Sequence, residues 1–150
     1  MAAGFSIKES NLELLEDFIQ NDYSKINKNF ELVFEYDAEI PALAINRIFY
    51  NEINKLGPFG NENTQPIFLI KDVKILRSRL VNENHINSII KPKSGSSINA
   101  ICFNCANTRL GEYLLSYKKE INIIGQITEN SSRGKNSIQL NIKDMFLRVN

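Results

Sequence analysis

The fold is decided by the stretch Leu56-Gly57-Pro58-Phe59-Gly60-Asn61-Glu62-Asn63-Thr64-Gln65-Pro66. Its glycine and proline residues end a helix, because proline lacks the backbone N–H that a helix needs and glycine tolerates the conformation of a helix end. Before this stretch, apolar residues recur at helical spacing, and after it they alternate with polar residues as in β-strands. The stretch therefore marks the point where the chain changes from helices to strands.

Two helices are predicted before this stretch. Ser10 and Glu13 form a capping-box pattern at the start of an amphipathic helix over about 10–22. Pro41 is expected to open the second helix at its first turn, since proline fits there. The apolar face of this helix is expected to contain Ile45, Ile48, Phe49, Ile53 and Leu56. Between the helices, residues 30–36 are aromatic and branched and predict a strand.

Five strands and one helix are predicted after this stretch. The strands are expected over about 67–80, 85–90, 98–104, 121–128 and 137–147, and the helix over about 108–117. A turn is expected at 81–84 and polar loops at 91–97 and 129–136. Five short strands with a helix between the third and the fourth match a Greek-key barrel of the oligonucleotide-binding (OB) type. The sequence thus predicts an α+β fold, with a five-stranded OB-type barrel preceded by a truncated α/β segment and a linker helix.

Charge is distributed unevenly along the chain. Residues 1–40 carry three basic and nine acidic side chains, a net charge of −6, whereas residues 41–150 carry 15 basic and eight acidic side chains, a net charge of +7. A basic second part favours an anionic partner. The alternative is that each part simply has a charged face in contact with water.

Composition excludes several classes of protein. The chain does not start with a signal-peptide pattern, and no apolar run reaches the ~20 residues that span a bilayer. Two cysteines are too few for the disulfide scaffold of a small secreted protein. We therefore expect a cytoplasmic location and no membrane partner.

Three short segments resemble the C-terminal part of the RecJ family, the bacterial single-strand-specific 5′→3′ DNA exonucleases. Residues 1–6 resemble the segment that follows the Gly-Gly-His motif of the family's DHH-associated domain. Residues 56–66 resemble its Leu-Glu-Pro-Phe-Gly…Asn-Pro-x-Pro junction. Residues 130–140 resemble its Asn-x-Trp-Arg-Gly…Val-Gln-Leu signature, with Ser132 in place of the tryptophan. The order and spacing of the three segments agree along the whole chain.

The resemblance implies a domain organisation and a function. Residues 1–40 would be a remnant of the DHH-associated domain, 41–57 a linker helix and 58–150 a RecJ-type OB nucleic-acid-binding domain. The implied function is single-stranded DNA binding in recombination and repair. The implied partners are single-stranded DNA and a separate DHH catalytic polypeptide or repair protein. The alternatives are a protein–protein interaction module of a repair complex and a non-functional remnant of a split gene.

Catalysis is not expected from this chain alone. The resembled family cleaves phosphodiesters with Mg²⁺ or Mn²⁺ ions held in its DHH domain, and two-metal hydrolysis needs clustered carboxylates and imidazoles. This chain has a single histidine, His85, and its 17 acidic residues include no Asp-x-Asp or Asp-His-His cluster. We therefore assign no catalytic residue, no metal site and no cofactor to it.

Cys102 and Cys105 form a Cys-x-x-Cys pattern, for which three interpretations are open. A redox pair would open a helix after a strand, which is roughly where the pattern falls. A zinc site would need a second pair or nearby histidines, and only His85 is available. The third interpretation is a buried strand cysteine next to one at the start of a helix.

The nucleic-acid-binding candidates are basic residues at the places where OB barrels bind oligonucleotides, namely the face of strands two and three and the loops 1–2 and 4–5. Each lysine or arginine can neutralise a phosphate and release a counterion. The candidates are Lys71, Lys74, Arg77 and Arg79 on the first strand, Lys91 and Lys93 after the second, and Arg133 and Lys135 in the last loop. The alternative is ordinary solubilising charge.

Arg133 is the strongest single candidate, because its loop position, its charge and the resemblance agree. His85, Asn104 and Gln139 are lesser polar candidates. Phe103 alternates with Ile101 and is expected in the core, and the chain has no tryptophan. Binding should therefore depend on phosphate contacts more than on base stacking.

Overall fold

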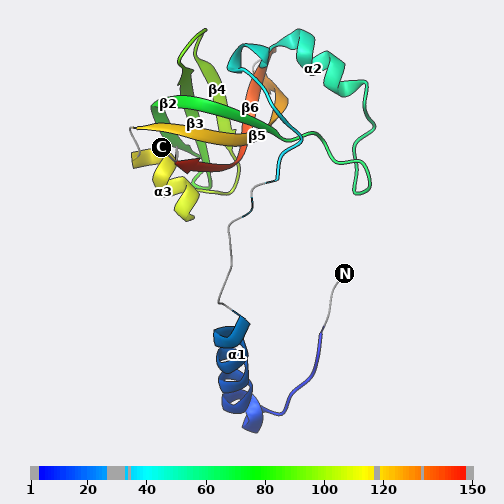
Figure 1. Cartoon of the computed structure of the whole chain (residues 1–150), viewed down its shortest axis with the longest axis vertical. Coiled ribbons are helices and arrows are strands. Elements are labelled where there is room, and N and C mark those ends of the chain that lie inside the picture. Colours follow the sequence, from blue (N-terminus) through cyan, green and yellow to red (C-terminus); the bar gives the residue numbers. More distant parts are fainter. Residues whose placement is uncertain (1–3, 27–32, 34, 117–118, 133, 148–150) are drawn as a thin grey trace. The chain divides into compact units, whose positions relative to one another are not determined.

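The computed structural model describes residues 4–26, 33, 35–116, 119–132 and 134–147, with only the backbone described for 23–26, 132 and 135. The chain divides into two compact units, residues 1–34 and 35–150 (Figure 1). The first unit contains the 3₁₀ turn η1 (Glu9–Asn11) and the helix α1 (Leu12–Ile26). The second unit contains the other elements.

The first unit confirms the predicted helix but not its predicted cap. The 3₁₀ turn η1 precedes α1, and the Ser10 hydroxyl bonds to Asn11 Oδ1 at 3.4 Å instead of to a backbone N–H. Leu14, Phe18 and Ile19 on α1 are exposed. Most of the predicted strand at 30–36 lies outside the described residues.

The second unit is built around a closed barrel, which confirms the predicted OB-type fold. The strands are β2 (Phe68–Val81), β3 (His85–Pro92), β4 (Ile98–Cys102), β5 (Glu120–Ser132) and β6 (Lys135–Leu147). They follow the order β2-β3-β4-β6-β5, and antiparallel pairing of β5 with β2 closes the barrel. Only β4 and β6 pair in parallel among these strands, with Ala100 opposite Leu140. Closure pairs the strand edges that an open sheet would leave free.

The predicted polar loop at 129–136 is wrong, because β5 and β6 pair almost to their connection. Asn130 pairs with Ser137 and Ser131 with Asn136. Antiparallel ribbons can face water, so polar residues on both sides do not prevent pairing. Gly134 has φ of 73°, a left-handed conformation suited to a tight turn. The connection is therefore two residues long.

The helix α2 (Arg47–Asn54) begins later than predicted. Pro41 precedes the 3₁₀ turn η2 (Ala42–Ala44) instead of opening α2. The cap is Asn46, whose Oδ1 accepts a hydrogen bond from the Phe49 N–H at 3.0 Å. A capping side chain accepts a hydrogen bond from one of the free N–H groups at the start of a helix. Pro41 lies outside α2 and cannot satisfy any of these groups.

Both helices of the second unit pack on the barrel, at opposite sides of it in Figure 1. On α2, Ile53 is buried and the Phe49 ring lies 5.5 Å from that of Phe68, but Ile48 and Leu56 are exposed, so the predicted apolar face is only partly confirmed. The helix α3 (Arg109–Ser116) lies between β4 and β5 as predicted, and its Leu114 is buried in the core.

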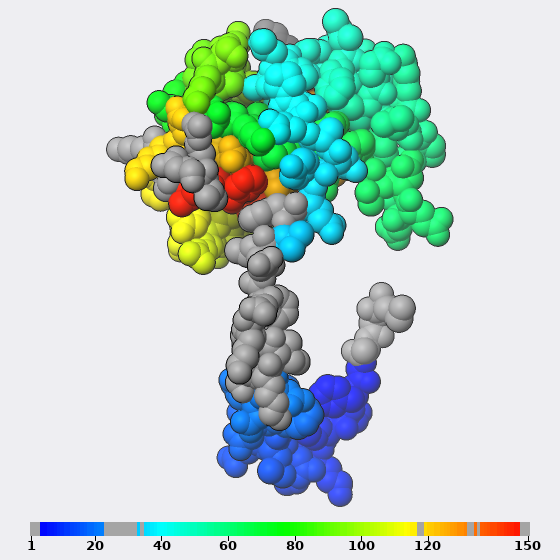
Figure 2. All heavy atoms as spheres, viewed as in Figure 1, coloured from blue at the N-terminus to red at the C-terminus, as the bar shows by residue number. Residues whose placement is uncertain are grey.

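Residues 35–46 are attached to the barrel by a strand that the sequence did not predict. This strand, β1 (Ala38–Glu39), pairs in parallel with the start of β2. Ile40 joins the core, and Arg47 donates a hydrogen bond to Glu129 at 2.5 Å. In the space-filling view this segment, in cyan, lies directly against the barrel (Figure 2).

None of the helices in the described ranges is long and apolar enough to cross a membrane.

These contacts lead us to expect a protease-resistant fragment that begins near residue 35. Limited proteolysis, followed by mass spectrometry of the products, should remove the first unit while 35–150 stays intact, because α1 exposes its apolar side chains whereas β1 and α2 pack on the barrel. A resistant fragment that begins only at about residue 58 would contradict this expectation. The assignment of 1–40 to a remnant of another domain stays a prediction.

Candidate nucleic-acid interface

Two irregularities in β2 determine which side chains face outward. The register with β5 shifts between Ile70 and Val73, and the register with β3 shifts between Ile75 and Arg77. Each β-bulge adds one residue and so reverses the alternation of faces beyond it. As a result, the outer face of β2 carries all the predicted cations of this strand, Lys71, Lys74, Arg77 and Arg79.

Arg77 and Arg79 line a groove of about 260 Å³ on the outer face of β2, β3 and β4. Across the strands, Arg77 pairs with Ile89 and Arg79 with Asn87, and Asn99 of β4 lies opposite Ile89. Within the described part of the chain, neither arginine forms an ion pair. The structure therefore brings two predicted cations together in one groove.

The sequence analysis missed the two amides of this groove, Asn87 and Asn99. The signal was present in the alternation, because Ile86, Ser88 and Ile90 of β3 are buried and the residues between them must face outward. Antiparallel register then places Asn99 beside Ile89 on the same face.

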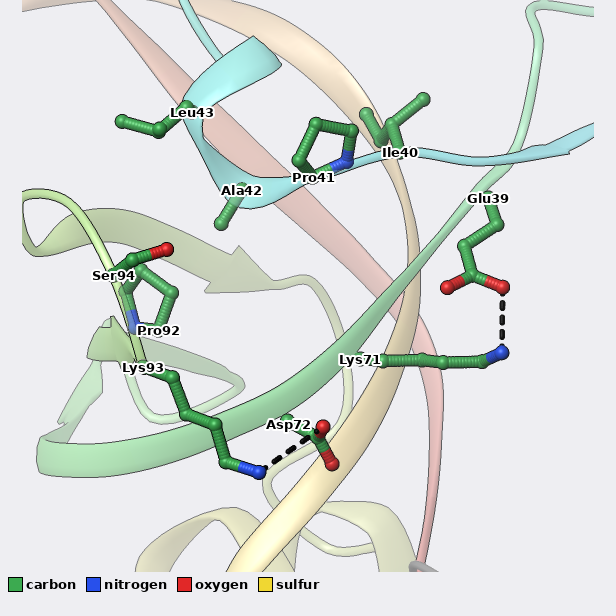
Figure 3. A pocket seen from close by; sticks show the side chains of 10 residues that line it. All are labelled: Glu39, Ile40, Pro41, Ala42, Leu43, Lys71, Asp72, Pro92, Lys93 and Ser94. Carbon is green, nitrogen blue, oxygen red and sulfur yellow. Dashed lines mark hydrogen bonds and ion pairs between the residues drawn. The ribbon is translucent and has the colours of Figure 1, made fainter.

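Two of the predicted lysines, Lys71 on β2 and Lys93 just after β3, are paired with carboxylates. Lys71 Nζ lies 2.5 Å from a carboxylate oxygen of Glu39, and Lys93 Nζ lies 3.3 Å from one of Asp72. These four residues line a depression of about 430 Å³, where the two pairs are drawn with dashed lines (Figure 3). The hydrogen bond that the Lys71 ammonium donates to the Glu39 carboxylate raises the pKa of Lys71. These pairs reduce the positive potential available to a phosphate, so they make Lys71 and Lys93 weaker candidates than the arginines.

Lys74 and Lys91 lie opposite each other on β2 and β3, one row from the groove. Lys74 is 3.7 Å from Glu120, which is also 3.6 Å from Lys93. Lys91 Nζ donates a hydrogen bond to the Gly95 carbonyl at 2.6 Å. Glu120 weakens Lys74 as a candidate in the same way as the other paired lysines, whereas Lys91 has no carboxylate partner among the described residues and extends the positive face beyond the arginines.

His85 and Asn104 are brought together at the other end of this face. The Asn104 N–H donates to His85 Nδ1 at 3.0 Å, and the His85 ring lies edge-on to Phe103 at 5.3 Å between centroids. Phe103 is 51% exposed, so its predicted place in the core is wrong. The strand β4 ends at Cys102, so Phe103 lies in the turn that follows it and not in the strand that faces the core.

The remaining candidates do not form part of a described site. Gln139 is only 7% exposed. Arg133 lies outside the described residues, and only the backbone of Lys135, in β6, is described. Binding by the β5–β6 connection therefore stays a prediction.

Cys102 and Cys105 are both buried and Cys102 ends β4, as the third interpretation of the Cys-x-x-Cys pattern expects, but Cys105 lies in the turn before α3 and not at the start of that helix. The Cys105 thiol donates to the Cys102 carbonyl at 3.4 Å. Burial, followed by the hydrogen bond with Cys105, raises the pKa of the Cys102 thiol well above its ordinary value. A thiol held in the protonated form is a poor nucleophile and a poor metal ligand.

The residues that the structure describes do not fit the metal site of the resembled family. No group of three or more His, Cys, Asp or Glu side chains among them is arranged to hold a metal ion. Two-metal hydrolysis requires such a group.

Comparisons with known proteins agree with the barrel. A family model described as the RecJ OB domain matches residues 36–144. The single-stranded-DNA-specific exonuclease RecJ of Haemophilus influenzae is 30% identical over 151 residues, covering 93% of this chain and 24% of that protein. The protein of the same name from Dickeya dadantii is 25% identical over 152 residues, covering 97% of this chain and 25% of that protein. The chain thus spans about a quarter of the length of these curated relatives.

Solved structures show the same fold. Crystal structures of RecJ from Thermus thermophilus, in complex with Mn²⁺ and with Mg²⁺, have TM-scores of 0.67 and 0.65 at 16% identity. The match covers 98% of this chain and 21% and 22% of those chains. Since the family model also spans most of the chain, from just before β1 to near the end of β6, this chain belongs to the RecJ OB domain family.

Proposed function

We propose that the second unit binds single-stranded DNA across the outer face of β2, β3 and β4. The observation that carries this proposal is the groove in which Arg77 and Arg79 lie beside Asn87 and Asn99. OB barrels bind oligonucleotides on this face. The two guanidinium groups have no carboxylate partner among the described residues, so they are available for phosphates.

Phosphate neutralisation would supply most of the affinity and little sequence choice. Each guanidinium can donate two parallel hydrogen bonds to a phosphate, and each neutralised phosphate releases a counterion. The amides of Asn87 and Asn99 can both donate and accept hydrogen bonds, so they could contact the edges of different bases. Lys91, one row from the groove, would continue the phosphate track at one end of it.

We further propose that the chain acts as the DNA-binding module of a RecJ-like exonuclease in recombination and repair. The relatives that support this are named single-stranded-DNA-specific exonucleases. Catalysis would then belong to a DHH domain elsewhere, which would also hold the Mg²⁺ or Mn²⁺ ions. The module would hold single-stranded DNA for that domain.

A second candidate function is docking on a repair protein, and one observation favours it. The helix α1 exposes Leu14, Phe18 and Ile19, and apolar side chains gathered on one helix are typical of interaction surfaces. This function concerns the first unit, so it can accompany DNA binding by the second unit or replace it.

Fluorescence anisotropy with the full chain tests the proposal. We expect binding to an oligo-dT and to a mixed-sequence single strand with similar affinity, and weaker binding to a duplex of the same mixed sequence. The logarithm of the association constant should fall linearly with the logarithm of the salt concentration. Its slope should be about −1.4 or steeper, because each arginine contributes about −0.7. Failure to bind any single strand at low salt would refute DNA binding and leave the docking function.

A further inference from the structure

We propose that a depression around Phe103, Asn141 and Lys143 binds one nucleotide of the single strand, with its base stacked on the Phe103 ring. This inference rests on the proposed function, because it extends the same bound strand beyond the arginine groove. It adds base stacking to a surface that otherwise offers hydrogen bonds and phosphate contacts.

Phe103 presents a fixed aromatic face to solvent. Its ring is half-exposed, and the His85 ring supports it in an edge-on arrangement with 76° between the ring planes. His85 is in turn oriented by the Asn104 N–H, which donates to Nδ1 at 3.0 Å. A ring held in place in this way loses little conformational entropy when a base stacks on it.

The depression beside this ring, about 240 Å³ in volume, contains the other two groups that a nucleotide needs. Asn141 and Lys143 of β6 both line it, and Lys143, the extra residue of a β-bulge between Ile142 and Asp144, is exposed. Neither side chain has a hydrogen bond or ion pair with another described side chain. The amide can pair with the edge of a base, and the ammonium with a phosphate.

The strand register connects this depression to the arginine groove. Arg79 pairs with Asn87, Asn87 with Ile101 and Ile101 with Asn141, so these residues form one row across β2, β3, β4 and β6. Three strand spacings of about 4.8 Å place the two ends of the row ~14 Å apart. A short single strand can therefore lie across the row, with phosphates at Arg79 and a base at Phe103.

The experiment compares an oligo-dT with an abasic oligonucleotide of the same length, which keeps the phosphates but lacks the bases. Phe103→Leu should weaken binding to the oligo-dT about fivefold or more, since stacking contributes roughly 1–3 kcal/mol per base. Binding to the abasic oligonucleotide should be unchanged. Lys143→Gln should weaken both and reduce the salt slope by about 0.7. Phe18→Leu, which alters a phenylalanine of similar exposure (62%) on α1, is the matched control and should change neither.

A second variant gives a readout that does not depend on affinity. The chain has no tryptophan, so Phe103→Trp introduces the only indole fluorophore. Saturation with oligo-dT should quench its emission, and saturation with the abasic oligonucleotide should not. Equal effects of Phe103→Leu on the two oligonucleotides, or equal quenching by both, would overturn the stacking site while leaving phosphate binding at the arginines intact. If the unaltered chain binds neither oligonucleotide, the proposed function is overturned and this inference with it.

Discussion

The double substitution Arg77→Ala and Arg79→Ala is expected to weaken binding of single-stranded DNA by about 100-fold, or ~3 kcal/mol, at low salt. This magnitude assigns each guanidinium the lower ~1.5 kcal/mol of a hydrogen bond to a charged group. The salt slope should become shallower by about 1.4, because two counterions fewer are released. The fold should survive, since both side chains are exposed on the outside of the barrel. Anisotropy titrations at several salt concentrations measure both quantities.

Two controls separate the groove from general charge. Lys55→Ala removes an exposed cation at the C-terminal end of α2, outside the groove, where it pairs with Glu52 at 2.7 Å. This substitution should have little effect on DNA binding. Arg77→Lys with Arg79→Lys keeps both charges and should keep the salt slope, while losing the parallel hydrogen bonds that only a guanidinium makes. If the alanine and Lys55→Ala variants bind equally well, the groove is not the binding face.

Gly111→Ala is expected to destabilise the second unit by more than about 3 kcal/mol, and to lower its melting temperature by more than ~10 °C. An added Cβ at Gly111 would lie 2.0 Å from the Cys105 carbonyl oxygen and 3.0 Å from that of Ala106. Both are backbone atoms, which cannot rotate away as a side chain can. Since α3 buries Leu114 in the core, moving the helix to relieve the clash would open the barrel at that side. Thermal denaturation followed by circular dichroism measures the change.

Gly60→Ala provides the matched control for this substitution. Its added Cβ would have no atom within 4 Å, and its φ is not in the left-handed region. We expect its stability to stay within ~1 kcal/mol of the unaltered chain. An unchanged melting temperature for Gly111→Ala would show that α3 does not approach the Cys105 backbone as closely as described.

The barrel could be predicted from sequence because its strands follow simple alternation. In β3, buried Ile86, Ser88 and Ile90 alternate with half-buried residues, and the turn before it contains Asn82 and Glu83 with positive φ. Such patterns depend on neighbouring residues alone. The strand order and the intervening helix then select one known architecture.

The failures occurred where a distant contact overrides the local pattern. Residues 129–136 are polar enough for a loop, yet most of them belong to β5 and β6, which pair with each other. Pro41 suits the first turn of a helix, but Asn46 provides a better cap a few residues later. Phe103 is apolar, but the strand predicted to contain it ends one residue earlier, so it lies in an exposed turn to which the alternation does not extend.

The sequence predicted which type of residue would form the candidate binding site, but not how these residues are arranged. Charge alone suggested that all four cations of β2 were equivalent. Carboxylates from β1 and β5, Glu39 and Glu120, are close to the lysines only in the folded state, and this separates the paired lysines from the arginines. No spacing in the sequence reveals which carboxylate will fold onto which cation.

The bulge at Leu76 determines the direction of the charge on β2. Leu76 is the extra residue of this bulge, so if the same residues formed a regular strand with Ile75 facing inward, Arg77 and Arg79 would face the interior of the barrel. A buried guanidinium without a partner is strongly destabilising. Composition therefore sets how much positive charge the strand carries, whereas the bulge sets the direction in which that charge points.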